Sequence, residues 1–126
     1  MSSAAAIIPA PTRSLYCASK AASLTLYQSL AIEHPKIRFT HILPATVEGD
    51  FRTSAVDAGP VREASPSKHG LKRDDVAQRL INAIDEGEKE VFLPWWYVRI
   101  GHFLYWITPS TVEHLARKKY NFTASP

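Results

Sequence analysis

Tyr16 and Lys20 lie four residues apart, and Ser3 precedes the tyrosine by thirteen positions. On a helix, this i,i+4 spacing places the ammonium group beside the phenol. A tyrosine hydroxyl ordinarily loses its proton near pH ~10, but a neighbouring cation favours the phenolate and moves such a group toward useful acid–base chemistry. With a serine hydroxyl to hold a substrate oxygen, these three side chains are suited to redox chemistry at an alcohol or carbonyl group.

The elements expected around these residues are those of a layered α/β fold. A helix is predicted from Leu15 to Glu33. It is expected to end there because His34, the residue before Pro35, disfavours helical geometry. A strand from Ile37 to Leu43 follows and leads into Pro44. Ligands of open parallel sheets bind beyond the carboxyl ends of strands, so Pro44 is suitably placed for a site.

A second helix is predicted from Arg73 to Glu86 and a second strand from Glu90 to Leu93. Alternation of helices and strands favours a parallel sheet. The polar segment 48–72 is interpreted either as a mobile loop over a substrate or as a solvated connector. Small residues on the first helix suit either core packing or a helix contact in a dimer: Ala18, Ala21, Ala22, Thr25 and Ser29.

Ser3, the run Tyr16-Cys17-Ala18-Ser19-Lys20 and the segment Pro44-Ala45-Thr46-Val47 together resemble the short-chain dehydrogenase/reductase family. The resemblance covers nearly the whole chain but only the second half of that family's fold. It implies an α/β structure, namely the C-terminal half of a Rossmann-like parallel sheet with flanking helices.

The resemblance also implies roles for individual residues. Tyr16 is expected to be the general acid or base, Ser3 to orient the substrate oxygen, and Lys20 to tune the tyrosine and bind the nicotinamide ribose. Pro44, Ala45, Thr46 and Val47 are expected to line the nicotinamide, so the cofactor-binding set is Tyr16, Lys20 and these four residues. The implied cofactor is NADP or NAD, and NADP is favoured by similarity to microsomal members.

Two positions depart from the family's pattern, and one motif is missing. Ala45 stands where glycine is usual, and Gly49 stands where a threonine is common. The five glycines are too scattered to form the Gly-rich turn that holds a dinucleotide pyrophosphate. We therefore expect a partial dehydrogenase acting on an apolar alcohol or ketone. The alternatives are a non-catalytic fragment that serves as an interaction or dimerisation module, and a chain that does not fold stably alone.

An aromatic C-terminal segment, 95–126, follows a catalytic part that spans residues 1–94. Three tryptophans lie in this segment, and Arg117, Lys118 and Lys119 follow them. One interpretation is peripheral contact with a membrane surface, and the other is an apolar segment that closes the substrate pocket or a subunit interface. The endoplasmic reticulum surface or the cytoplasm is the expected location.

Composition excludes several other functions. A net charge of +3 with scattered basic residues argues against a nucleic-acid surface. The single cysteine cannot form an intrachain disulfide, and the histidines show no spacing typical of a metal site. No serine lies in the Gly-x-Ser-x-Gly turn of a hydrolase.

Overall fold

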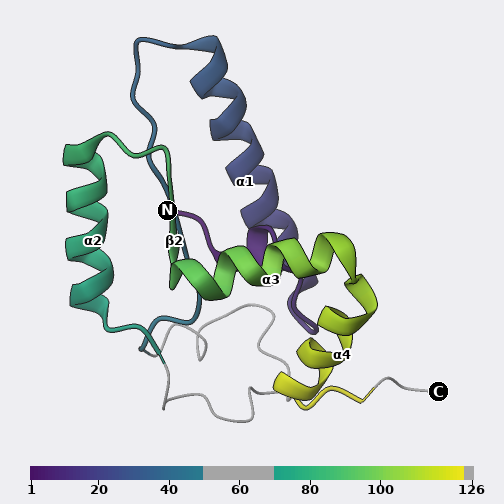
Figure 1. Cartoon of the computed structure of the whole chain (residues 1–126). Coiled ribbons are helices and arrows are strands. Elements are labelled where there is room, and N and C mark those ends of the chain that lie inside the picture. The colour runs from purple at the N-terminus through teal and green to yellow at the C-terminus, as the bar shows by residue number, and fades with distance from the viewer. Residues whose placement is uncertain (50–69, 124–126) are drawn as a thin grey trace.

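The computed structural model describes residues 1–49 and 70–123, and Figure 1 shows their arrangement. Most of the polar segment 48–72 therefore lies outside the described residues. The elements, in chain order, are η1 (Ala4–Ala6), α1 (Ser14–Glu33), β1 (His41–Pro44), α2 (Arg73–Glu86), β2 (Glu90–Leu93), α3 (Trp95–Ile107) and α4 (Pro109–Lys119).

The two strands pair in parallel, with His41 opposite Glu90 and Pro44 opposite Leu93. A parallel bridge between Val47 and Leu71 joins the segment after β1 to the segment that precedes α2. The predicted α/β class is confirmed. A small parallel sheet flanked by helices is consistent with part of a Rossmann-like fold.

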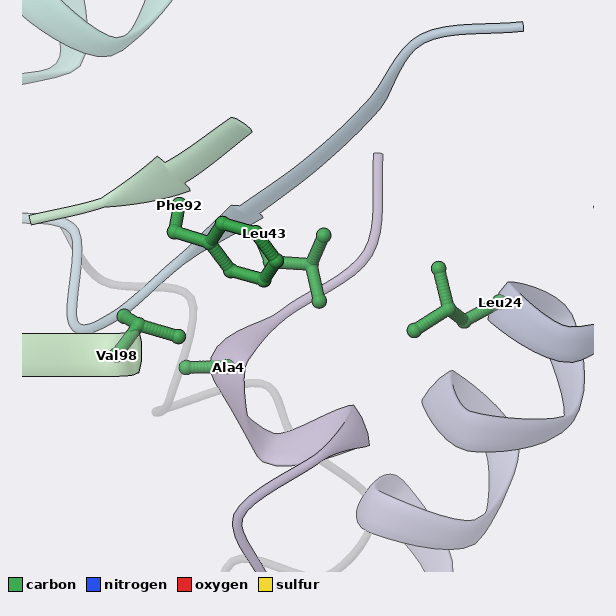
Figure 2. Close-up of a cluster of buried hydrophobic side chains, with 5 residues drawn as sticks. All are labelled: Ala4, Leu24, Leu43, Phe92 and Val98. Atoms are coloured by element: carbon green, nitrogen blue, oxygen red, sulfur yellow. The ribbon is translucent and has the colours of Figure 1, made fainter. Parts of the chain in front are cut away.

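Helices cover both faces of the sheet because neighbouring strand residues point to opposite sides. On one face, Leu43 and Phe92 pack with residues of η1, α1 and α3, and Figure 2 shows this cluster of Ala4, Leu24, Leu43, Phe92 and Val98. On the other face, Ile42 and Val91 pack against α2, in a cluster of Ile42, Val76, Ala83 and Val91. Figure 1 shows α1 and α2 on opposite sides of β2.

The first strand is shorter than predicted, because it begins at His41 and not at Ile37. Its pairing partner β2 begins only at Glu90, so the described sheet offers no backbone partner to residues 37–40. The amide of Ile37 instead donates to the His34 carbonyl in the turn that follows α1. Strand propensity alone does not create a strand without a neighbouring ladder.

The predicted bounds of α2 agree with the structure. Asp74 and Asp75 lie in its first turn, where their negative charges interact favourably with the positive end of the helix dipole. Gly87 ends the helix in a left-handed conformation at φ +70°, and its amide donates to carbonyls of the last turn. The next residue, Glu88, pairs with Arg79 of α2, with 2.6 Å between Nη1 and Oε1. This pair anchors the helix end to the segment that leads into β2.

The C-terminal helices turn back toward the first helix. Val98 of α3 is fully buried in the cluster of Figure 2, while α4 packs chiefly on α3. Across residues 1–49 and 70–123, every helix falls short of the length or apolar character that a bilayer-crossing helix requires.

Candidate active site

One cavity of about 850 Å³ gathers the site residues that the sequence predicted. Its walls come from η1 and the loop after it, the first turns of α1, the segment after β1, and helices α3 and α4. The predicted residues that line it are Ser3, Tyr16, Lys20, Pro44, Ala45, Thr46 and Val47. Their shared position is a finding, whereas their roles in catalysis and cofactor binding stay predictions.

Ser3 is held by the short segment that runs beside β1. The amide of Ser2 donates to the Ile42 carbonyl at 2.9 Å, so this segment follows the edge of the strand. Ser3 caps η1, and its Oγ accepts a hydrogen bond of 3.2 Å from the Ala5 amide. That contact uses the oxygen as acceptor and leaves the hydroxyl proton for donation to a ligand. Among the described elements, Ser3 thus begins a 3-10 turn and does not end a strand.

Tyr16 and Lys20 lie on the first turns of α1, as their spacing predicts. The Lys20 Nζ is 5.7 Å from the centroid of the tyrosine ring. Buried Ser2 ties this part of the helix to the N-terminal segment, because its hydroxyl donates to the Lys20 carbonyl at 3.3 Å. The helix and the serine segment are therefore linked directly beside the site.

Arg13 is a cavity residue that sequence reasoning missed. Its guanidinium carbon lies 4.7 Å from the centroid of the Tyr16 ring, within the range of a cation–π contact. The tyrosine therefore has two cations close to its ring, Arg13 and Lys20. The i,i+3 spacing of Arg13 and Tyr16 was the available signal, because such residues are neighbours along a helical turn.

The segment after β1 is fixed by backbone hydrogen bonds. The Ala45 amide donates to the Leu93 carbonyl at 2.6 Å, and the Leu71 amide donates to the Thr46 carbonyl at 2.9 Å. Gly49 has φ +132°, a conformation that L side chains rarely adopt, so glycine suits this turn. Residues 44–47 thus form a fixed wall of the cavity at the carboxyl end of the sheet. This wall is called the ledge below.

Another wall comes from the C-terminal helices and is mainly apolar, with Tyr97 and Lys119 as its polar members. Trp96, Ile100 and Leu104 of α3 line the cavity together with Val112 and Leu115 of α4. These residues support the interpretation that the C-terminal segment closes the pocket. Such a wall suits an apolar ligand. A polar ligand group placed against it would lose its hydration without gaining a hydrogen-bond partner.

Within residues 1–49 and 70–123, histidine, cysteine and carboxylate side chains form no cluster of three suited to a metal ion. The described lining places the hydroxyl groups of Ser3 and Tyr16 in the same cavity as the cationic side chains of Arg13 and Lys20.

Comparison with known proteins gives a partial relationship. No protein-family model matches the chain. It is 44% identical over 54 residues to the 11-beta-hydroxysteroid dehydrogenase-like protein 3 of Arabidopsis thaliana, a match that covers 42% of this chain and 18% of that protein. The chain thus matches less than a fifth of that protein's length. This likeness supports, for part of the chain, a relationship to oxidoreductases of the dehydrogenase type.

Proposed function

We propose that this chain carries the catalytic residues of a nicotinamide-dependent oxidoreductase that interconverts an alcohol and a carbonyl group on an apolar compound. The observation that carries the proposal is the shared cavity of Ser3, Tyr16 and Lys20 with the ledge after β1. The partial likeness to a dehydrogenase-like protein supports the same class of reaction.

In this proposal each polar residue has one task. The Ser3 hydroxyl donates a hydrogen bond to the substrate oxygen and holds it near the Tyr16 hydroxyl. In the oxidation direction, Tyr16 takes the proton from the substrate hydroxyl, and in reduction it returns a proton to the carbonyl oxygen. The Lys20 ammonium, 5.7 Å from the centroid of the tyrosine ring, places a positive charge beside the reacting groups. These tasks balance the loss or gain of the proton at oxygen.

A nicotinamide cofactor would accept or donate the hydride at the substrate carbon. The fixed ledge of Pro44, Ala45, Thr46 and Val47 offers a flat wall for a ring, and Lys20 offers a donor for ribose hydroxyls. Arg73 lies beside Gly49: its guanidinium carbon is 3.6 Å from the position that a Cβ atom would take if Gly49 were replaced by alanine. A cation here suits the phosphates that NADP and NAD share, and we favour NADP over NAD only from the resemblance to microsomal family members. The Gly-rich pyrophosphate turn is not among the motifs of this sequence.

The test is a pair of measurements on the whole chain. Binding of NADPH and NADH is followed by the fluorescence of the reduced nicotinamide, and turnover of apolar ketones is followed by its absorbance. Tyr16→Phe is expected to reduce turnover by at least ~100-fold while cofactor affinity is retained. Tyr27→Phe is the matched control, because Tyr27 lies exposed on the same helix. Undiminished turnover in Tyr16→Phe would contradict the assigned role.

Exposed apolar residues on α1 favour a second candidate function, a docking or dimerisation module. Leu24 is the buried residue of this helix, whereas Leu15, Leu26 and Ile32 are exposed. Leu15 and Leu26 lie on one side of the helix, whereas Ile32 lies on another. Exposed apolar side chains of this kind are typical of an interaction surface. Sedimentation of the whole chain tests this, since Leu26→Glu should disrupt an assembly formed through α1. Failure to bind either cofactor, combined with such an assembly, would favour the module over the enzyme.

We also propose that α3 contacts a membrane surface. Trp95, Phe103 and Trp106 are all more than half exposed, and Arg99 is exposed beside them on the helix. Aromatic rings together with a basic residue are typical of helices that lie at the interface between lipid and water.

A further inference from the structure

Four lysine and arginine side chains line the cavity, namely Arg13, Lys20, Arg73 and Lys119. Within residues 1–49 and 70–123, no ion pair joins Arg13, Lys20 or Arg73 to a carboxylate. Glu48 is the acidic residue among the cavity's described lining. A half-buried cation without an anionic partner keeps its attraction for an anion, and Arg13 and Lys20 are half-buried. The lining therefore combines apolar walls with an excess of positive charge.

These cations lie in different parts of the site. Arg73 lies beside Gly49, at the ledge to which we assign the cofactor. Lys20 belongs to the proposed catalytic set. Arg13 lies one turn before Tyr16, at the start of α1, and the loop residues Pro9 and Ala10 line the cavity on its N-terminal side. Lys119 of α4 donates to the Tyr97 hydroxyl at 3.2 Å. Arg13 is thus the cation beside Tyr16 that the proposed reaction leaves without a task.

The position of the guanidinium is defined by its contact with the tyrosine. Its carbon lies 4.7 Å from the ring centroid, so the planar group rests on the phenol and has its N–H donors at its edge. An arginine held in this way retains its capacity for a two-point hydrogen bond to a carboxylate or sulfate. A ligand anion bound there would lie close to the tyrosine that acts on the substrate.

From this geometry we infer that the cavity selects an amphipathic anion: an apolar alcohol or ketone that also carries a carboxylate or sulfate group, which Arg13 binds. The apolar body of the ligand lies against Trp96, Ile100 and Leu104. This inference rests on the proposed function for the identity of the reacting group, but the binding preference itself does not depend on turnover.

The experiment compares a matched pair of probes, ω-hydroxydodecanoate and its methyl ester, which differ in one negative charge. Dissociation constants are measured on the whole chain by titration calorimetry and by the fluorescence of the tryptophans, one of which lines the cavity. We expect the acid to bind roughly tenfold more tightly than the ester, and this preference to decrease as salt is added. Equal affinity of acid and ester in the unmodified chain, or binding of neither, would overturn the inference.

Variants identify the residue responsible. Arg13→Ala should abolish the preference and leave the affinity for the ester unchanged, and Arg13→Lys should keep part of it, because lysine retains the charge but not the two-point geometry. Arg99→Ala is the control, since Arg99 lies over the Phe92 ring and does not line the cavity. A preference that survives in Arg13→Ala contradicts the assignment.

A competition measurement separates the substrate anion from a cofactor phosphate. If Arg13→Ala lowered the affinity for NADPH and left the affinity for ω-hydroxydodecanoate unchanged, the arginine would belong to the cofactor site and the inference would be wrong. The proposed function fails by a different result, namely undiminished turnover in Tyr16→Phe. The two failures are therefore distinguishable.

Discussion

The hydroxyl of Ser2 donates a hydrogen bond of 3.3 Å to the backbone carbonyl of Lys20, between segments eighteen residues apart in sequence. Ser2 is buried, and its own amide donates to Ile42 of β1. The contact therefore joins the helix that carries two of the predicted catalytic residues to the segment that carries the third. The spacing of the site depends on a residue that is not itself expected to touch substrate.

Removal of this contact should weaken the fold measurably. We expect Ser2→Ala to lower the free energy of unfolding by about 1 kcal/mol, because a partly buried hydrogen bond is lost. A urea titration measures the change. Ser29→Ala is the control, because that serine is exposed and its hydroxyl bonds only to the Thr25 carbonyl of its own helix. An equal loss in both variants would argue against a specific role for Ser2.

Val98 is expected to be one of the most sensitive positions in the core. Its side chain is fully buried between the sheet and η1 (Figure 2). Val98→Ala should cost about 2 kcal/mol of unfolding free energy, because it removes apolar contacts and leaves a small cavity. The same substitution at Val112, which is only partly buried, is the comparison. A smaller loss at Val98 than at Val112 would show that α3 does not pack as described.

Acid should weaken the Arg79–Glu88 ion pair at the end of α2 and so lower the stability of the fold. The Arg79 guanidinium, which hydrogen-bonds the carboxylate, holds the pKa of Glu88 below its ordinary value of 4.5. Because the folded-state pKa is lowered, the pair stabilises the fold fully above the unfolded-state pKa and loses this contribution as the pH falls through the folded-state value. Glu88→Gln should therefore destabilise the chain near neutral pH and differ little from the unmodified chain near pH ~3.

The measurement is thermal unfolding across the acid range, and Glu113→Gln is the control. Glu113 forms an exposed pair with Arg117 at 3.8 Å on α4, which is worth at most about 0.5 kcal/mol. A difference between Glu88→Gln and the unmodified chain that persists at low pH would contradict the ion pair as its cause.

Gly87 should resist replacement by residues with a Cβ. It ends α2 at φ +70°, where alanine is strained by about 1 kcal/mol. Gly87→Asn is the matched control, because asparagine adopts this conformation more readily. Denaturant unfolding of both variants tests the prediction, and a stabilising effect of alanine would contradict the assigned backbone geometry.

Contact with lipid is tested by cosedimentation with vesicles of phosphatidylcholine and phosphatidylserine. Trp106→Ser should reduce binding several-fold, because this exposed indole contributes to the aromatic face of α3. Ile32→Ser is the control, since Ile32 is equally exposed on α1. Equal losses in the two variants would indicate general hydrophobicity, and no binding by the unmodified chain would reject membrane contact.

Much of the architecture follows from local sequence signals. The bounds of α2 and the length of α1 agree with the predictions, because capping residues, Pro35 and Gly87 act within a few residues of the helix ends. The start of β1 was predicted four residues too early, because strand length depends on the partner strand and not on propensity. Pairing with β2 is a distant contact that no local pattern reveals.

The candidate site residues were chosen from motif spacing, and their roles stay predictions. Ser3, Tyr16 and Lys20 carry motif spacing, and all three line the cavity as expected of neighbours. The rest of the wall was not assigned residue by residue, because the positions of Trp96 and Leu115 depend on how α3 packs on the sheet and α4 on α3. Arg13 was missed because a cation beside a tyrosine acquires its meaning only when the cavity is known.

The buried cluster in Figure 2 has a consequence for how the pocket can evolve. Ala4 follows Ser3 directly, and Val98 lies between two residues of the pocket wall, Trp96 and Ile100, yet both side chains share one core. A substitution that reshapes the wall through this core also shifts the serine. Ligand preference and reaction rate are therefore expected to change together unless paired substitutions within this cluster compensate for each other.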